Sequence, residues 1–316
     1  MAPQIVTLTS PNGRSTARIL TGYGFNCFEY QAEIDGQPYD VLWSLPGFES
    51  GELRPSSSGI PVLFPFPGRI QRGELTWEGR QFQLPQNDRT GNAIHGFVFN
   101  RAWRVLEATS QRVVGEFQAS IDDPSLLELW PADFTLTAEY ELLDDRLVSN
   151  FTVANPDSKP LPWGFGTHPY FRLPGETAEQ RDQCRLIVPV AEKWELEELN
   201  PTGRRLPIEA ALVGELHQGA TLQDRQFDNV FTGIQPTENS ESALTTAGGR
   251  RLVTVEFSAP VRELVVFTPP HREAVCIEPY TCAPDPIRLQ QQGVDGGLNV
   301  LSAGEQMVIR LIYRIG

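Results

Sequence analysis

Hydrophobic and polar residues alternate along most of this chain, in short runs separated by glycine, proline, asparagine and aspartate. A period of two residues places the apolar side chains on one face of an extended segment, so each run predicts a half-buried β-strand. The segments with this pattern are Gln4–Leu8, Ala17–Gly22, Cys27–Ile34, Tyr39–Ser44, Leu186–Val190, Leu252–Phe257, Glu263–Thr268, Ala274–Glu278 and Gln306–Tyr313.

Further runs lie close enough in the sequence to form hairpins. These pairs are Glu74–Trp77 with Gln81–Leu84, Trp103–Ala108 with Val113–Ile121, and Phe134–Leu142 with Arg146–Val153. Helical periodicity is confined to Pro124–Leu129 and Ala178–Gln183. Because strands do not alternate with longer helices, an α/β barrel or doubly wound fold is disfavoured. We predict an all-β protein, a large antiparallel β-sandwich formed by a single domain over residues 1–316.

The charge of the chain limits its partners. With 40 acidic and 26 basic residues, the formal net charge is −14 at pH 7, which disfavours nucleic acid or an anionic membrane surface as a partner. The same charge weighs against a multiply anionic ligand, although a local basic pocket would override it. The N-terminus has no signal-peptide pattern, and no stretch approaches the ~18 apolar residues of a membrane helix. We therefore expect a soluble, cytoplasmic protein.

The chain contains the cysteines Cys27, Cys184, Cys276 and Cys282, and no two of them form a CxxC pair. Neither a zinc knuckle nor a dithiol redox motif is indicated. Reduced thiols are expected in a cytosolic protein. A disulfide between Cys276 and Cys282 remains open on the sequence alone.

The segment Trp163–Phe171, WGFGTHPYF, surrounds His168 with aromatic residues. Its glycines permit close approach of a ligand, and Pro169 biases His168 toward an extended or turn conformation. The pattern predicts an aromatic-lined recess with one titratable group. A histidine buried only for packing is the competing interpretation. It loses weight because the chain has only four histidines, and another of them, His95, has a similar setting.

Other candidate residues lie in segments that do not fit a regular strand interior. Arg69 ends a proline-rich stretch, and taken alone it fits a surface loop as well as a cleft. His95 and Asp228, each taken alone, are better explained by structural roles, the latter as an Asx-turn at the start of a strand. Glu278 ends an apolar run just before a proline. It favours a cleft, because carboxylates are almost never buried without a partner.

A metal site formed by the histidines and a carboxylate is a weaker interpretation. No HxH or HExxH spacing is present, so we expect no metal. His217 lies in a polar run and is expected at the surface. His271 follows two prolines and is expected in a loop.

Taken together, these segments resemble the aldose 1-epimerase (galactose mutarotase) family. The matching pieces follow the family's order and cover most of the chain: LFPFPGRI at 63–70, NAIHG at 92–96, the run from Trp130 through Phe171 that contains THPYF, FDNVF at 227–231 and CIEPYT at 276–281. Gly68 stands where the family often has asparagine, and Phe97 where it often has a second glycine. Both departures lie in binding loops, so we expect them to affect the choice of sugar more than the reaction.

The resemblance implies a single-domain β-supersandwich whose cleft interconverts the α and β anomers of a free aldose similar to glucose or galactose. By position in the matching motifs, Glu278 corresponds to the general base and His168 to the general acid. Arg69, His95 and Asp228 correspond to the residues that hold the sugar hydroxyls. Near neutral pH a carboxylate accepts a proton, and a histidine held protonated by a neighbouring carboxylate donates one. No cofactor is required, and the expected partner is a monosaccharide bound by a monomer or homodimer.

Two alternatives stay open. A hexose-6-phosphate 1-epimerase would share the acid–base pair and would need cations for the phosphate, for which Arg69 and Arg72 are candidates. A non-enzymatic sugar-binding β-sandwich would keep the aromatic cleft. The presence of both Glu278 and His168 weighs against that second alternative.

Overall fold

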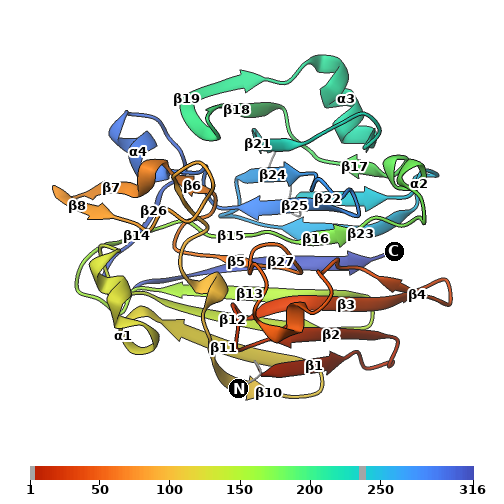
Figure 1. Cartoon of the computed structure of the whole chain (residues 1–316), viewed down its shortest axis with the longest axis horizontal. Coiled ribbons are helices and arrows are strands. Elements are labelled where there is room, and N and C mark those ends of the chain that lie inside the picture. Colours follow the sequence, from red (N-terminus) through yellow and green to blue (C-terminus); the bar gives the residue numbers. More distant parts are fainter. Residues whose placement is uncertain (1–3, 235–239) are drawn as a thin grey trace.

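Figure 1 shows the computed structural model of the chain, which describes residues 4–234 and 240–316. The protein is all-β, and its neighbouring strands pair antiparallel. The largest sheet has nine strands in the order β10 (Arg104–Ala108), β11 (Arg112–Gln118), β12 (Thr135–Leu142), β13 (Arg146–Ala154), β27 (Gln306–Ile315), β23 (Arg251–Phe257), β22 (Ser240–Thr245), β17 (Arg185–Ile187) and β20 (Ala220–Thr221).

A second sheet has eight strands. Their order is β19 (Asn200–Pro207), β18 (Glu192–Glu197), β21 (Asp228–Thr232), β24 (Glu263–Phe267), β25 (Ala274–Tyr280), β15 (Gly166–Thr167) and β5 (Val62–Leu63), with β16 (Tyr170–Arg172) also paired to β25. A third sheet consists of β1 (Ile5–Thr9), β2 (Ser15–Leu20), β3 (Asn26–Ile34) and β4 (Gln37–Asp40).

Smaller elements connect these sheets. The two-stranded ladders are β6 (Arg69–Ile70) with β9 (Ala93–Ile94), β7 (Glu74–Trp77) with β8 (Arg80–Gln83), and β14 (Leu161–Trp163) with β26 (Asn299–Leu301). The helices are short: α1 (Ala119–Asp122), α2 (Ala178–Asp182), α3 (Ala210–Gln218) and α4 (Pro286–Gln291). Within the described residues, no helix is long and apolar enough to cross a membrane.

The sheets form two layers, one behind the other in Figure 1. Isolated bridges pair Cys27 with Ile60 and Leu42 with Phe171, so the N-terminal sheet continues the layer of the eight-stranded one. Between the layers lies one large hydrophobic cluster, to which both layers contribute buried side chains. Its members include Ile19 of β2, Leu136 of β12, Ile277 of β25 and Ile309 of β27.

This packing decides which face of β25 is available for a site. Val275 and Ile277 belong to the central hydrophobic cluster. Because successive side chains of a strand point to opposite faces, Cys276, Glu278 and Tyr280 project from the other face of the sheet. The polar side chains of this strand therefore point away from the core between the layers.

Much of the predicted secondary structure is confirmed. The turn at Asp144-Asp145 joins β12 to β13, and the turn around Gly79 joins β7 to β8. The predicted helical turns are present as a 3₁₀-helix at Pro124–Glu128 and as α2.

The prediction that a strand extends to Ile121 is wrong. The strand β11 ends at Gln118, and α1 follows directly. The Asp133 carboxylate accepts hydrogen bonds from the Ser120 N–H (2.9 Å) and hydroxyl (2.6 Å). Side-chain acceptors of this kind compete with the ladder and divert the backbone from it.

The sequence pattern also missed β18, β19 and α3. The two strands form the edge of the eight-stranded sheet and are rich in charged residues, with Pro201 and Pro207 in β19. The outermost strand, β19, tolerates proline and charge because one of its sides makes no ladder, and β18 pairs with β21 only at Glu192 and Lys193. In α3, which contains Gly214, only Leu216 is fully buried, so its apolar periodicity is weak.

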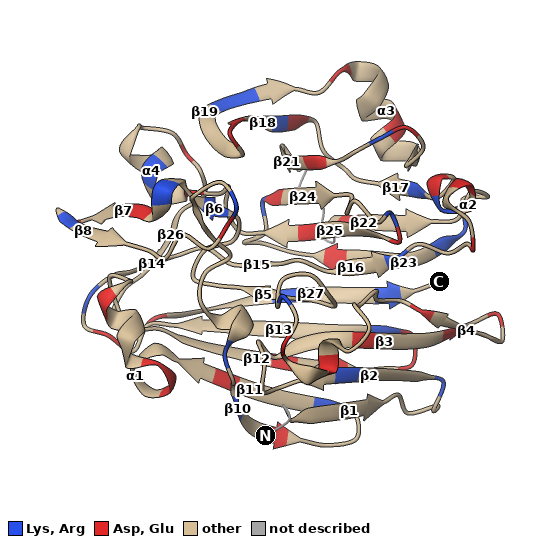
Figure 2. Cartoon of the chain, viewed as in Figure 1, with Lys and Arg blue, Asp and Glu red and all other residues tan. Residues whose placement is uncertain are grey.

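Charged residues of both signs are dispersed over the two layers. Figure 2 shows Lys and Arg scattered among Asp and Glu, without a continuous basic face in this view. Any positive potential that a ligand meets on this side of the molecule is therefore local.

Candidate functional site

A cleft of about 560 Å³ opens on the face of the eight-stranded sheet that points away from the core. Every candidate residue from the sequence lines it: Arg69, His95, His168, Asp228 and Glu278. The strands β25, β21 and β6 and the loops before β16 and after β9 contribute these side chains. Sheet pairing has therefore assembled residues from distant parts of the chain in one recess.

Glu278 lies at the floor of this cleft and is 1% exposed. Glu278 lies within β25, opposite Val265 of β24. The sequence analysis had placed Glu278 at the end of its strand, but β25 continues for two more residues, to Tyr280. Its Oε2 accepts a hydrogen bond from the Tyr280 hydroxyl (2.7 Å). Its Oε1 faces His168 Nε2 at 3.3 Å and accepts no hydrogen bond from the described residues.

His168 joins β15 to β16 and is 7% exposed. Its backbone N–H donates to the Pro61 carbonyl (3.1 Å), and its ring stacks on Tyr170 with centroids 4.7 Å apart. A Cβ at Gly166 would meet the Tyr280 ring at 2.4 Å. Glycine at position 166 therefore lets the Tyr280 ring, whose hydroxyl binds Glu278, pack against β15, the strand that precedes His168.

Burial shifts the two groups in opposite directions. It raises the pKa of Glu278 well above its usual range and lowers the pKa of His168 to about 3. In both cases the shift arises because removal from water disfavours the charged form. We expected a neighbouring carboxylate to hold the imidazole protonated. The carboxyl group of Glu278 is present, but burial favours its own protonated form, so it does not hold the imidazole protonated.

His95 lies beside this pair. Its ring meets the His168 ring edge-on, with centroids 5.7 Å apart, and burial is the main cause that lowers its pKa. The residue has a φ of 68°, and Gly96 follows with a φ of 74°. A Cβ at Gly96 would lie 2.1 Å from the Phe64 carbonyl oxygen. The loop can therefore approach Phe64 and turn His95 into the cleft only with glycine at position 96.

Arg69 is fixed by a residue that the sequence analysis did not single out. Its Nε donates to Asp88 Oδ2 at 2.8 Å. The same carboxylate accepts hydrogen bonds from the backbone N–H groups of Thr90 (2.9 Å) and Asn92 (2.7 Å). These bonds and Arg69 lower the pKa of Asp88 far below its usual range, although burial opposes them. Asp88 therefore stays ionised and orients the guanidinium.

Asp228 is the first residue of β21 and lies opposite Phe267 of β24. Its side chain stays exposed at the mouth of the cleft. Partial removal from water raises the pKa of the Asp228 carboxyl, and the positive charge of Arg69 opposes this rise. Asp228 and Arg69 thus offer an acceptor and a donor to one ligand.

An aromatic wall adds Trp43 and His271, whose rings stack with centroids 4.0 Å apart. The Trp43 indole N–H donates to the Glu273 carboxylate (2.8 Å), and the Glu273 backbone N–H donates to His271 Nδ1 (3.0 Å). We expected His271 in a loop, which is confirmed. Its position in the cleft wall was not predicted.

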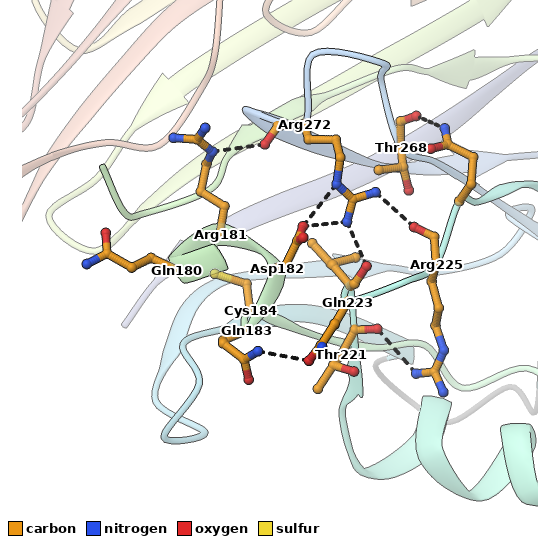
Figure 3. Close-up of polar contacts among 12 residues, drawn as sticks. Gln180, Arg181, Asp182, Gln183, Cys184, Thr221, Gln223, Arg225, Thr268 and Arg272 are labelled. Carbon is orange, nitrogen blue, oxygen red and sulfur yellow. Dashed lines mark hydrogen bonds and ion pairs between the residues drawn. The ribbon is translucent and has the colours of Figure 1, made fainter. Parts of the chain in front are cut away.

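Arg272 fastens the loop that carries His271, as Figure 3 shows. Its Nε donates to the Asp182 carboxylate of α2 (2.9 Å), and its guanidinium also reaches the carbonyl oxygens of Leu222 (2.7 Å) and Arg225 (3.0 Å). The carbonyl of Arg272 accepts a hydrogen bond from Arg181 (3.1 Å). One side chain thereby ties this wall of the cleft to two neighbouring segments.

One group of side chains has the composition of a metal site. Ligand atoms of His168, Cys276 and Glu278 lie within 4.8 Å of one another. Cysteine binds metal as the thiolate, and burial together with the charge of Glu278 raises the pKa of Cys276 well above its usual range. The thiol stays protonated, which makes this group a poor metal site.

The sequence analysis missed several residues of the cleft for one common reason. Asp88, His271 and Arg54, which also lines the cleft, lie in connections without regular periodicity. Only the Asp-x-Thr spacing around Asp88 carried a local signal, that of an Asx-turn.

The chain matches the sequence profile of the aldose 1-epimerase family over residues 5–314. The chain is 23% identical to the uncharacterized protein YphB of Escherichia coli K12, over 85% of this chain and 87% of that protein. It is 26% identical to the uncharacterized protein YihR of the same organism, over 80% of this chain and 77% of that protein.

Solved structures share the fold. A galactose mutarotase-like protein from Clostridium acetobutylicum superposes with a TM-score of 0.83 at 21% identity, covering 100% of this chain and 99% of the other. A GalM/aldose epimerase homologue from C. elegans gives a TM-score of 0.81 at 16% identity, with the same coverage of 100% and 99%. The predicted all-β sandwich architecture is thereby confirmed.

Proposed function

Because the chain belongs to the aldose 1-epimerase family, we propose that its cleft interconverts the α and β anomers of an aldose with a free anomeric hydroxyl. Glu278 acts as the general base and His168 as the general acid. The observation that carries this proposal is the 3.3 Å contact between the buried imidazole and the buried carboxylate at the floor of the cleft. Two titratable groups with pKa values shifted by the same burial are typical of acid–base sites.

The proposed reaction opens and closes the sugar ring. Glu278 takes the proton of the anomeric hydroxyl while His168 gives a proton to the ring oxygen, and the bond between C1 and that oxygen breaks. The aldehyde turns about the C1–C2 bond. Closure on its other face reverses both proton transfers, so the opposite anomer leaves and both groups recover their starting protonation.

Burial favours the ring-opened stage of this cycle. Ring opening starts from an imidazolium beside a carboxylate, which is the minor form of the pair, because burial favours neutral His168 and protonated Glu278 in the empty cleft. After opening, Glu278 holds the proton from the anomeric oxygen and His168 is neutral. Desolvation stabilises this uncharged state of the pair. The ring-opened stage therefore has the protonation of the pair that burial favours in the empty cleft.

The remaining candidates serve as binding residues in this proposal. Arg69, oriented by Asp88, donates to sugar hydroxyls, His95 donates to or accepts from them, and Asp228 accepts at the mouth of the cleft. An apolar ring face such as that of Phe267 packs on the C–H face of a pyranose. These contacts fix the anomeric carbon over the acid–base pair, which is the condition for proton transfer.

The test is polarimetry on freshly dissolved α-D-glucose and α-D-galactose, with and without protein. The wild type should speed relaxation to an unchanged end point. Glu278→Gln and His168→Ala should each reduce that acceleration by about 10²–10⁴-fold, the usual worth of one positioned acid or base. Glu33→Gln and His217→Ala are matched controls at exposed positions and should retain full activity.

Two outcomes would contradict the proposal. Unchanged turnover in Glu278→Gln would remove that residue from the base role. A folded wild type that accelerates no aldose, charged or neutral, would instead favour a sugar-binding protein without catalysis. Circular dichroism on each variant separates loss of chemistry from loss of fold.

A further inference from the structure

A tight turn at Arg54–Ser57 lies beside the acid–base pair. The Ser57 N–H donates to the Arg54 carbonyl (3.3 Å), and Arg54 Nε donates to the Ser56 hydroxyl (3.3 Å). The Tyr170 hydroxyl donates to the Ser56 carbonyl (2.9 Å). The Tyr170 ring is the one that stacks on His168, so this turn is anchored to the same aromatic support as the proposed general acid.

The Arg54 guanidinium has no carboxylate partner among the described residues, and its terminal nitrogens make no hydrogen bond there. It nevertheless lines the cleft, and its charge helps to lower the pKa values of His95 and His168. Arg69 differs, because Asp88 neutralises it at 2.8 Å. Arg54 thus supplies uncompensated positive charge inside a protein whose formal net charge is −14.

Two further groups accompany Arg54 in the lining of the cleft. Arg89 lies on the segment that also carries Asp88 and forms no ion pair with the described residues. Ser57 offers a hydroxyl that makes no hydrogen bond within the described part of the chain. A guanidinium and a hydroxyl on one turn, with a second cation in the same cleft, form a typical set of donors for an anion.

The chemistry of the ring indicates which part of a sugar this set would meet. In an aldohexopyranose the ring oxygen is bonded to C1 and C5, and C5 carries the exocyclic C6. If His168 protonates the ring oxygen, the C6 substituent lies on the same side of the sugar as the surroundings of His168. Those surroundings include Tyr170 and the Arg54–Ser57 turn.

We propose that the cleft takes an aldose that carries an anionic group on C6, a hexose 6-phosphate or a uronate, and that Arg54 and Ser57 bind this anion. The inference rests on the proposed anomer interconversion and narrows its substrate class. The cations suggested by the sequence for a phosphate were Arg69 and Arg72. Arg69 is occupied by Asp88, and Arg72 lines a separate depression with Glu74 and Arg288.

The test measures anomer exchange at equilibrium by NMR exchange spectroscopy for glucose, glucose 6-phosphate and glucuronate at low ionic strength. For the wild type, kcat/KM should be about 10- to 100-fold higher for an anionic sugar than for glucose, the worth of a charge-assisted contact. The phosphate and carboxylate sugars tell which anion is preferred. Added NaCl should shrink this preference, because exposed charges are screened.

Arg54→Gln should bring the preference close to one, chiefly through a higher KM for the anionic sugar. Ser57→Ala should reduce it by a smaller factor. Arg72→Gln is the matched control, since it removes a cation outside the cleft, and should keep the wild-type preference.

Specific results would overturn the inference. Acceleration of glucose exchange without a preference for either anionic sugar in the wild type would overturn it and leave the proposed function standing. An undiminished preference in a folded Arg54→Gln would overturn the role of Arg54. No acceleration of any sugar by the wild type would overturn the inference together with the proposed function.

Discussion

At the scale of single residues, burial changes the proton affinities of His168 and Glu278 in opposite directions. An exposed histidine and glutamate would both be charged between their ordinary pKa values of 4.5 and 6.5. Here desolvation pushes the imidazole toward its neutral form and the carboxyl toward its protonated form. The pair therefore holds one proton over a wide range of pH, which an acid–base pair needs.

The pH dependence of turnover follows from this proton count. As pH falls through the lowered pKa of His168, about 3, the pair gains a second proton and loses its base. As pH rises through the raised pKa of Glu278, the pair loses its last proton and with it the acid. We expect kcat/KM to have an acid limb well below 6.5, the ordinary pKa of histidine, and a basic limb well above 4.5, the ordinary pKa of glutamate.

The test measures kcat/KM for anomer exchange from pH 3 to 9, in steps of about one pH unit. Circular dichroism at each pH excludes acid unfolding. His217→Ala serves as the control, because it removes an exposed histidine outside the cleft. An acid limb centred near 6.5 that persists in this control would show that an ordinary histidine titrates in the reaction.

At the scale of elements, glycine decides how closely the loop after β9 approaches the strand β5. Gly96 and Gly79 share a positive φ, 74° and 79°. A Cβ at Gly96 would lie 2.1 Å from the Phe64 carbonyl oxygen, whereas one at Gly79 would meet nothing within 4 Å. Alanine would bring a similar backbone strain at both positions, but only at position 96 would its Cβ clash with the Phe64 carbonyl.

Gly79→Ala should lower the free energy of unfolding by about 1 kcal/mol, the cost of a positive φ. Gly96→Ala should lower it by about 2–4 kcal/mol, because overpacking adds to that cost. Denaturant unfolding of both variants measures the difference. Equal losses would mean that the Phe64 contact relaxes at no cost and does not hold His95 in place.

The loop around Arg272 offers a second prediction at this scale. Arg272→Gln removes the contacts with Asp182, Leu222 and Arg225 that tie this wall of the cleft to its neighbours. We expect KM to rise severalfold with a smaller change in kcat, because the wall binds substrate without touching the reacting protons. Steady-state kinetics measure this split.

Arg204→Gln is the control for that variant, since it breaks an exposed ion pair with Glu195 outside the cleft. It should leave KM unchanged, as surface pairs contribute little. A fall in kcat for Arg272→Gln as large as the rise in KM would indicate that the network also positions His168 or Glu278.

At the scale of the whole molecule, the closed sandwich protects its thiols. Cys27, Cys184, Cys276 and Cys282 are free and at most 2% exposed. Burial raises the pKa of each thiol, to about 11 for Cys184. Reaction with a disulfide reagent needs both access and a thiolate, and the fold denies both.

Ellman's reagent should therefore find no reactive thiol in the native protein within minutes and four in denaturant without reductant. The denatured sample is the internal control for reagent and protein concentration. Two reactive thiols in denaturant would reveal a disulfide, such as one between Cys276 and Cys282, and would contradict the structure.

The sequence by itself determined the strand content of the protein and several of its turns. Period-two alternation depends only on the direction of successive side chains along an extended chain, so it can be read without knowing the partner of a strand. It failed at β18 and β19, the two charged strands at one end of the eight-stranded sheet, and at α3, which buries little. The chemical types of the candidate residues, such as His168 among aromatic rings, were also visible in the sequence.

Only the tertiary structure decided which of these residues meet. The pairing of Gly166 with Tyr280 brings the loop of His168 beside Glu278, and no local pattern encodes the order of strands in a sheet. Long-range packing likewise gave Arg69 its partner Asp88 and left Arg54 without a carboxylate partner among the residues that the structure describes. The pKa shifts of His168 and Glu278 also depend on the tertiary structure, because they arise from the exclusion of water by the residues packed around the cleft.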